Sequence, residues 1–149
     1  MIMSDPNNIN LSLMKGKKGV IMGVANDHSI AWGIAQSLSA AGAELAFSYQ
    51  SETLKKRVEP LAKMLGSDLI YPCDVESSED IEIFFNSIQN KWESIDFLVH
   101  AIAFSDKSEL KGPYYNTTKE NFIKTMLVSC FSFTEVAKEA QKIMIGGGS

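Results

Sequence analysis

The sequence predicts an α/β fold: an open, doubly wound parallel sheet with helices on both faces, in three α/β/α layers. Short apolar runs alternate with longer segments whose apolar residues recur at the spacing of a helix that packs on one side. Each longer segment can hold a crossover helix, so consecutive strands are expected to pair in parallel with right-handed connections.

Four apolar runs are the expected strands: 19–24, 44–49, 68–72 and 95–100. The first run is apolar throughout rather than alternating with polar residues, which indicates a strand that is buried on both faces. Pro72 ends the third run, because proline cannot donate to the hydrogen-bond ladder of a sheet.

Four helices are expected to connect and follow these strands. Gly42 and Gly66 end the first two as C-caps, and serine and acidic residues at 77–80 begin the third. A capping box, Thr117-x-x-Glu120, starts a long fourth helix from about Lys119 to Ile143. The apolar stripes of the first three helices are Ile30, Ile34, Leu38 and Ala41; Leu54, Val58, Leu61 and Leu65; and Ile81, Phe84, Phe85, Ile88 and Trp92.

The composition is that of one globular domain, with 149 residues of which 45% are hydrophobic and 21% charged. A net charge of -4 argues against a nucleic-acid partner, and no apolar run reaches membrane-spanning length. The polar start lacks the pattern of a secretory signal, so a cytoplasmic location is expected. Cys73 and Cys130 are expected to be reduced core cysteines, and two histidines are too few for a metal site.

The turn between the first strand and the first helix is the most informative stretch. Gly23 allows a tight turn, Ser29 stands at the N-cap position, and the small residues Ala31 and Gly33 favour close packing of the helix on the sheet. In an open parallel sheet this turn binds the pyrophosphate of a dinucleotide. The GxGxxG fingerprint is absent, so on these residues alone nucleotide binding and an ordinary capped turn are equally supported.

The expected organisation is a tail at 1–15, an incomplete dinucleotide-binding domain at 16–145 and a glycine-rich end at 146–149. A sheet of this type usually has about six or seven strands. Only four are expected here, so the fold is predicted to be truncated after the fourth strand and the long helix that follows it. The end at 146–149 is either the turn into a further strand or an artificial tail.

The residues of the turn, Gly23, Ser29, Ala31 and Gly33, form a pattern that resembles the glycine-rich signature of the divergent short-chain dehydrogenases. The enoyl-acyl-carrier-protein reductases of bacterial fatty-acid synthesis belong to that group, and their fold is of the Rossmann type. The resemblance covers nearly everything from 16 to 144. Four further blocks resemble the same reductases in the same order: 42–50, 65–68, 73–75 and 100–104.

The resemblance implies two sets of site residues. Without it, a core role for Ile102 and a surface position for Ser105 are supported as well as a site role. For Asp74, a loop cap is the less supported alternative. The residues implied to bind cofactor are Gly23, Ser29, Ile30, Gln50, Asp74, Val75, Ala101 and Ile102, and those implied to contact substrate are Ala103, Phe104 and Ser105. The cofactor is expected to be NADH, because the neutral Gln50 follows the second strand and no arginine there can pair with a 2′-phosphate.

The implied reaction is hydride transfer from NADH to the β-carbon of a trans-2-enoyl thioester carried by acyl carrier protein. The family's tyrosine and lysine follow the fifth strand, so no catalytic residue is expected in this chain, and these 149 residues alone are expected to be inactive. Tyr115 and Lys119 spell Y-x-x-x-K, but Tyr115 precedes the capping box and lies in a loop, so we reject the pair as catalytic. The full-length family usually forms a homotetramer.

Two other functions fit the sequence less well. One is a short-chain reductase that acts on a ketone or alcohol; it often has an asparagine deep in the fourth helix, whereas Asn121 lies in the first turn here. The other is a non-catalytic dinucleotide-binding module, which predicts a complete four-stranded sheet. An open sheet edge beside the fourth strand would argue against that module.

Overall fold

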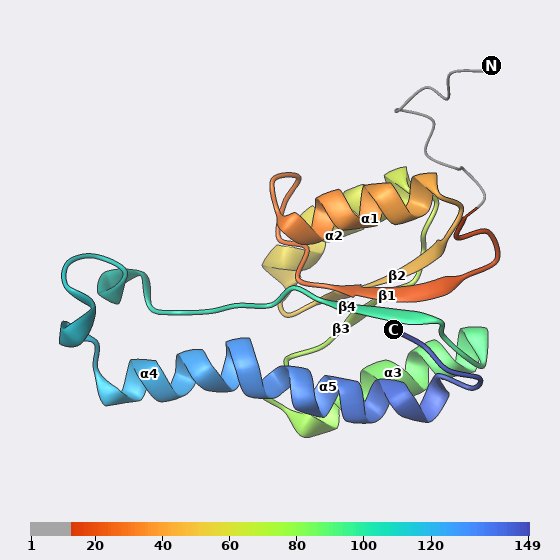
Figure 1. Ribbon diagram of the computed structural model, residues 1–149. Coiled ribbons are helices and arrows are strands. Elements are labelled where there is room, and N and C mark those ends of the chain that lie inside the picture. The colour runs from red at the N-terminus through yellow and green to blue at the C-terminus, as the bar shows by residue number, and fades with distance from the viewer. Residues whose placement is uncertain (1–12) are drawn as a thin grey trace, which may run out of the picture.

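Four parallel strands form one sheet in the order β3-β2-β1-β4, in a computed structural model that describes residues 13–149 (Figure 1). The strands are β1 (Lys18–Met22), β2 (Glu44–Tyr49), β3 (Ile70–Pro72) and β4 (Phe97–His100). Val20 in β1 is in register with Ala46 on one side and Leu98 on the other. The chain builds outward from β1 to β3 and then returns to the other side of β1, which confirms the doubly wound parallel sheet.

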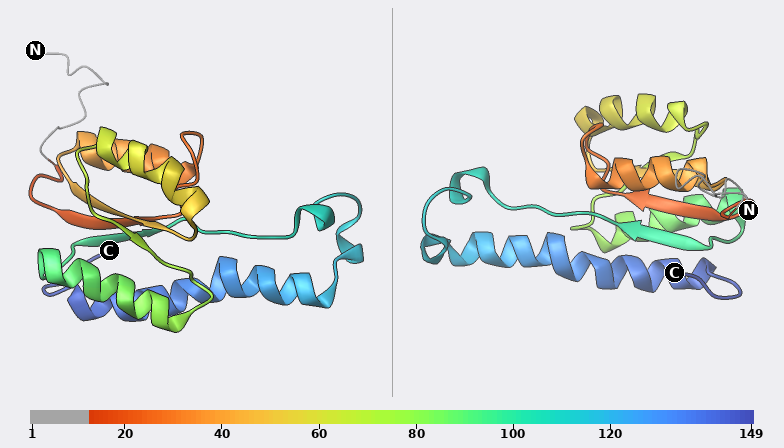
Figure 2. Two further views of the ribbon diagram at one scale, coloured as in Figure 1. Left: turned by 180° about the vertical axis from the view of Figure 1, so that it is seen from behind. Right: turned by 45° about the horizontal axis from the view of Figure 1, so that its top comes forward.

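Three connecting helices and one long helical segment cover the sheet (Figures 1 and 2). Helices α1 (Ile30–Ala40) and α2 (Glu52–Met64) lie on one face. Helices α3 (Ser78–Trp92) and α5 (Ser132–Ala140) lie on the other and pack against each other. These are the three predicted layers.

Strand β1 contributes to both cores, as its uniformly apolar sequence predicted. Val20 and Met22 are fully buried against α3 and α5, whereas Ile21 is fully buried against α1 and α2. Successive side chains of a strand point to opposite faces, so a strand covered by helices on both faces needs apolar residues at every position.

The buried face of α1 differs from the predicted stripe. Ile30 is 79% exposed, and Ala31, Trp32 and Ala35 make the contact with the core. The large Trp32 ring, 4% exposed, turns the helix so that Ile30 points to solvent. Gly33 was expected to allow close packing, but a Cβ there would meet nothing within 4 Å, so this prediction was wrong and the small buried residue is Ala31.

The long fourth helix is present but is not uniform. It consists of α4 (Lys119–Met126), a π-helical turn η3 (Leu127–Phe131), α5 and a final 3-10 turn η4 (Gln141–Ile143). Within it, the hydroxyl of Ser132, which is fully buried, donates to the carbonyl of Val128 at 2.7 Å. A side-chain bond to a carbonyl four residues earlier perturbs the regular helix ladder at this point.

The start of the long helix corrects the predicted capping box. Thr118, not Thr117, is the N-cap, and its hydroxyl accepts the N–H of Asn121. The acidic partner is Glu109, in the short turn η1 (Lys107–Glu109), whose carboxylate accepts both threonine hydroxyls and the N–H of Thr118. A carboxylate from the preceding loop therefore does what Glu120 was expected to do.

The two cysteines lie in different environments. Cys73 is buried, as predicted, but Cys130 is exposed, so the prediction of a core position for it was wrong. Cys130 lies on the π-helical turn η3. The apolar residues around Cys130 in the sequence suggest that it is buried. Several of them, including Phe131 and Phe133, are themselves about half exposed.

Residues 1–12, which make up most of the predicted tail, lie outside the described part of the chain. Met14 already packs on the core, and its N–H donates to the carbonyl of Ala41 at 2.9 Å. At the other end, the N–H of Ser149 donates to the carbonyl of Asp96, and its carbonyl accepts the N–H of Leu98. These bonds place 146–149 at the outer edge of β4, where a turn into a further parallel strand would lie.

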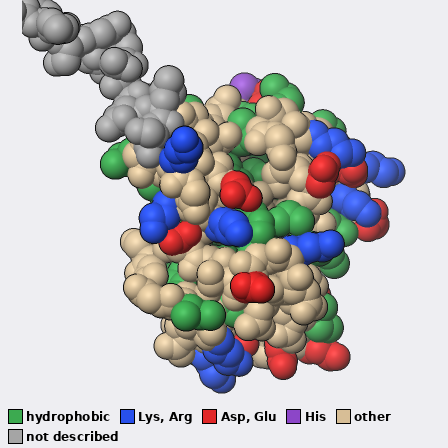
Figure 3. Space-filling model, turned by 90° about the vertical axis from the view of Figure 1, so that its right-hand side faces the viewer, with side chains coloured by type: hydrophobic (Ala, Val, Ile, Leu, Met, Phe, Trp, Pro, Cys, Tyr) green, Lys and Arg blue, Asp and Glu red, His purple; other side chains and the backbone are tan. Residues whose placement is uncertain are grey.

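The end of the molecule at which the strands begin carries charges of both signs, interspersed rather than gathered (Figure 3). One pair here joins sequence-distant segments: Lys17 Nζ lies 2.9 Å from Asp96 Oδ1. The second oxygen of Asp96 accepts the N–H of Lys18, and both contacts hold the pKa of this carboxyl below its ordinary value. No helix in the described part of the chain is long and apolar enough to cross a membrane.

Candidate functional site

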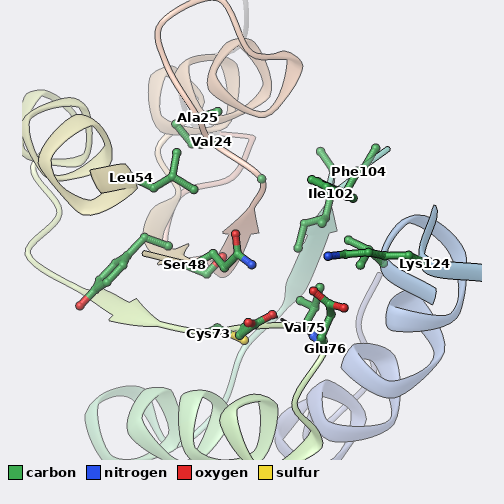
Figure 4. Close-up of a pocket in the computed structure, with 17 residues that line it drawn as sticks. Val24, Ala25, Ser48, Leu54, Cys73, Val75, Glu76, Ile102, Phe104 and Lys124 are labelled. Carbon is green, nitrogen blue, oxygen red and sulfur yellow. Dashed lines mark hydrogen bonds between the residues drawn. The ribbon is translucent and has the colours of Figure 1, made fainter. Parts of the chain in front are cut away.

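A cavity of about 220 Å³ opens at the carboxyl ends of the strands (Figure 4). It lies at the point where the strand order reverses between β1 and β4, the usual ligand position in open α/β sheets. It is lined by Gly23, Val24 and Ala25 after β1; Ser48, Tyr49, Gln50 and Leu54 around the end of β2; Cys73, Asp74, Val75 and Glu76 after β3; Ala101, Ile102, Ala103 and Phe104 after β4; and Lys124 and Val128 of the long helix.

A second cavity, of about 400 Å³, lies at the opposite ends of the strands. Its walls are 43–45, 65–69 and the end of α3 at Lys91 and Trp92. It is larger, but it has neither the strand-order reversal nor a helix N-terminus of the kind that binds phosphate in these sheets. We therefore take the first cavity, hereafter the cleft, as the functional site.

Gly23 forms the floor of the cleft and cannot be replaced without strain. Its φ is +105°, a conformation that side chains disfavour, as expected for a tight turn after the first strand. A Cβ at this position would lie 2.1 Å from the carbonyl oxygen of Ala101. The N–H of Ala101 in turn donates to the carbonyl of Met22 at 3.0 Å, so the backbones after β1 and β4 are in direct contact here.

The turn from Gly23 to α1 is held by its own polar groups. Asn26 Oδ1 accepts the N–H of His28 at 2.9 Å, and the Ser29 hydroxyl donates to the carbonyl of Asn26 at 2.7 Å. Ser29 stands at the N-cap position but makes no capping bond. The N–H groups at the start of α1 therefore have no side-chain cap, which is the condition for an anion to bind there.

The segment after β3 supplies the carboxylates of the cleft. Asp74 Oδ1 accepts the N–H of Glu76 at 3.0 Å, so Asp74 does cap its own loop, and it also lines the cavity. Beside it, burial raises the pKa of the Cys73 thiol to about 12, with smaller contributions from Asp80 and Asp74. This thiol therefore stays protonated and is no nucleophile.

The segment after β4 forms the opposite wall. Ile102 is half-buried and packs on the core beneath the cleft, so it is both a core residue and a lining residue. Lys124 reaches into the cleft from α4, and its Nζ lies 4.8 Å from the centre of the Phe104 ring (Figure 4). Lys124 is the one cation among the lining residues, which also include the carboxylates of Asp74 and Glu76.

His100, the last residue of β4, lies below this wall. Its Nε2 is 2.8 Å from the Ser132 hydroxyl. Because that hydroxyl gives its proton to the carbonyl of Val128, Nε2 is the donor. Burial lowers the pKa of His100, so the ring is neutral near pH 7. Among residues 13–149, no three His, Cys, Asp or Glu side chains are placed to hold a metal ion.

A family model described as enoyl-(acyl carrier protein) reductase matches residues 23–149. This chain belongs to that reductase family. A relative in Rhizobium meliloti, named enoyl-[acyl-carrier-protein] reductase [NADH] 2, is 59% identical over 92% of this chain and 51% of its own length. The chain thus spans about half the length of the curated relatives it matches.

Two solved structures of the family agree with the fold. FabI from Candidatus Liberibacter asiaticus has a TM-score of 0.90 at 59% identity, over 93% of this chain and 54% of that one. The reductase from Anaplasma phagocytophilum, solved in complex with NAD, has a TM-score of 0.87 at 55% identity, over 91% of this chain and 52% of that one.

The structure gathers most, but not all, of the residues that the reductase resemblance implies. Ser29 and Ile30 do not line the cleft: Ser29 bonds to Asn26, and the Ile30 side chain points to solvent. Ser105 does not line it either, because its hydroxyl bonds to Asn121 and Thr125. Those that do line it are Gly23, Gln50, Asp74, Val75, Ala101, Ile102, Ala103 and Phe104.

Sequence reasoning missed the contribution of the long helix to the cleft. Lys124 and Val128 are four positions apart, so they share one helix face, and both line the cleft. This spacing was visible in the sequence. Which face of the helix meets the strand ends depends on how the helix packs across the sheet, and no local pattern gives that.

Proposed function

We propose that this chain forms the cofactor-binding half of an NADH-dependent enoyl-acyl-carrier-protein reductase. The reaction is hydride transfer to the β-carbon of a trans-2-enoyl thioester carried by acyl carrier protein. The observation that carries the proposal is the convergence of eight of the eleven implied site residues on one cleft at the reversal point of the sheet. They come from four separate segments of the chain, one after each strand, so the convergence does not follow from sequence proximity.

The residues present fit a dinucleotide. Gly23, where a Cβ would clash with the Ala101 carbonyl, puts no side chain on the floor, and the uncapped start of α1 offers N–H groups to a pyrophosphate. Asp74 keeps one carboxylate oxygen beyond the one used in its loop, which suits the adenine amino group. NADH supplies the hydride when bound, and the protein's part is to bind and orient it.

NADH is favoured over NADPH by the residues around the end of β2. Gln50 is neutral and exposed at that point. A cation near this point, Lys55, has its Nζ 5.6 Å from the centre of the Tyr49 ring and 3.9 Å from a carboxylate oxygen of Glu52. Its charge is therefore already matched, and a 2′-phosphate would meet Glu52 as well as Lys55.

The catalytic tyrosine and lysine are proposed to lie in the part of the reductase that this chain does not span. Tyr115 is 83% exposed in the short turn η2 (Tyr114–Asn116), and Lys119 is the first residue of α4. The two side chains are on different elements and neither lines the cleft. This supports rejection of the Y-x-x-x-K pair.

The full-length enzyme is proposed to be a cytoplasmic homotetramer that uses the long helix for assembly. The long helical segment exposes more large apolar side chains than an isolated surface helix normally shows. They are Phe122, Ile123, Met126, Leu127, Phe131 and Phe133. Analytical ultracentrifugation of the full-length enzyme tests this: a monomer at micromolar concentration would contradict it.

The test of the proposed function is a substrate comparison on the complete reductase polypeptide that contains this chain. NADH oxidation is followed with crotonyl-acyl-carrier protein and, in parallel, with a ketone of similar length. The proposal predicts turnover of the enoyl thioester alone and a lower Kd for NADH than for NADPH. Turnover of the ketone alone would identify another short-chain reductase, and NADH binding without turnover would identify a non-catalytic module.

A further inference from the structure

The segment Phe104–Asp106, hereafter the mouth segment, lies where the cleft meets solvent, and side chains of the long helix hold it. Beyond β4 the chain has no regular structure until the turn η1, so no strand or helix ladder fixes the backbone here. Figure 1 shows this stretch running beyond the sheet, alongside α4. Its position therefore depends on the bonds that side chains make to it.

Ser129, on the π-helical turn η3, holds one end of the mouth segment. Its hydroxyl accepts the N–H of Phe104 at 3.0 Å and donates to the carbonyl of the same residue at 3.3 Å. One hydroxyl thus bonds both backbone groups of the residue whose ring lines the cleft. The Lys124 ammonium over that ring adds a third contact from the same helix.

Asn121, in the first turn of α4, holds the other end. Its side chain is buried, and Oδ1 accepts the N–H of Asp106 at 2.9 Å. Its Nδ2 donates to the hydroxyl of Ser105 at 3.1 Å and to that of Thr117 at 3.3 Å. Thr125 donates to the same Ser105 hydroxyl at 3.1 Å. Each of the three residues of the mouth segment is thereby bonded to the long helix.

We propose that Asn121 and Ser129 are positioning residues of the reductase, which fix the mouth segment so that Phe104 keeps its place on the substrate side of the cleft. The proposal rests on the proposed function. On this proposal the Ser105 hydroxyl helps to hold the mouth segment and does not contact substrate. Its bonds to Asn121 and Thr125 turn it away from the cleft. A loop held in this way presents a fixed wall to the acyl chain, and misplacement of that wall raises the cost of binding substrate.

The test uses the complete reductase and four variants. Asn121→Ala removes the carboxamide and Ser129→Ala the hydroxyl, whereas Ser129→Thr keeps a hydroxyl at the same position. Asn116→Ala is the matched control, because Asn116 is an exposed carboxamide in the same loop region, outside the cleft. The measurements are KM and kcat for crotonyl-acyl-carrier protein, the Kd for NADH, and the thermal unfolding midpoint.

Asn121→Ala and Ser129→Ala are each expected to raise KM for the enoyl substrate about tenfold, because each leaves backbone groups of the mouth segment without a partner. The Kd for NADH is expected to stay within about twofold, since the adenine end of the cleft is built by other segments. Ser129→Thr is expected to recover most of the wild-type KM, and Asn116→Ala to match the wild type throughout.

The outcomes separate this inference from the function on which it rests. If the wild type reduces no enoyl thioester, the proposed function is wrong. If the wild type is active and both alanine variants keep the wild-type KM, or lose NADH affinity in equal proportion, the positioning role is wrong. Should Asn121→Ala fail to fold, the comparison of Ser129→Ala with Ser129→Thr still decides, because both retain Asn121.

Discussion

The two sides of the cleft are built in different ways. On the side formed by the ends of β1, β2 and β3, the lining residues follow directly from strands, and the backbone contact between Gly23 and Ala101 sets the floor. On the side formed after β4, the lining residues lie in irregular chain that Asn121 and Ser129 hold by hydrogen bonds. Backbone geometry fixes the first side, and side-chain bonds fix the second, so different substitutions should break them.

The largest effect is expected at Gly23. Gly23→Ala places a Cβ 2.1 Å from the Ala101 carbonyl oxygen at a φ of +105°. Strain and overpacking together are expected to cost about 2–5 kcal/mol of unfolding free energy and to weaken NADH binding. Urea unfolding measures the first and a fluorescence titration the second.

Gly33→Ala is the matched control for that experiment. A Cβ at Gly33 meets nothing within 4 Å, and the residue is in the middle of α1 with an ordinary helical backbone. The substitution should raise the unfolding free energy by about 0.5–1 kcal/mol, because alanine has the better helix propensity. If both variants lost the same unfolding free energy, the close contact of Gly23 with Ala101 would not be what limits substitution at Gly23.

A smaller effect on binding is expected at Asp74, on the strand-built side. Asp74→Asn can still accept the N–H of Glu76, so the local turn should survive. The variant has lost the negative charge that suits the adenine amino group, and the Kd for NADH is expected to rise about tenfold. An unchanged Kd for NADH, with the fold intact by circular dichroism, would show that the adenine lies elsewhere.

Lys124 is expected to contribute less than Asp74 to NADH binding, and only through its positive charge. Lys124→Met keeps an apolar stem against Phe104 but removes the cation of the cleft. The Kd for NADH is expected to rise about threefold at low salt and to approach the wild-type value near 1 M salt, where charge interactions are screened. Lys119→Met, at the exposed start of the same helix, is the control and should show no such salt dependence.

The smallest effect concerns Glu109, which anchors the far end of the loop on the second side. Hydrogen bonds from Thr117 and Thr118 lower the pKa of this carboxyl to about 2. A lowered pKa means that the carboxylate stabilises the fold above its ordinary pKa and that this contribution is lost as the pH falls toward about 2. The stability difference between wild type and Glu109→Gln should therefore be constant at neutral pH and shrink below about pH 4.5. A stability difference between the two proteins that stays the same at acidic pH would contradict the lowered pKa of Glu109.

The same contrast explains what the sequence could predict. The strands, the layers and the tight turn at Gly23 depend on local pattern, and all were correct apart from strand ends that differ by one or two residues. Ile30 was misplaced because helical spacing alone leaves the phase of a stripe open by one or two positions, and the bulk of Trp32 decides it.

The second side of the cleft was less predictable because its contacts join residues far apart in sequence. Ser105 was expected at the substrate, but Asn121 and Thr125, sixteen and twenty positions away, take its hydroxyl. In the same way Glu109 replaces Glu120 at the start of the long helix, and Lys124 enters the cleft from a face that only the packed fold defines. Such long-range polar contacts leave no periodicity in the sequence.

The most direct test of this account is a crystal structure of the complete polypeptide that contains this chain, with NADH bound. We predict that the adenine lies between Asp74 and Val75 and that the nicotinamide points toward Ala101–Phe104, along the cleft described above. An adenine bound in the second cavity beside Trp92, or a dinucleotide running in the opposite direction, would contradict the account.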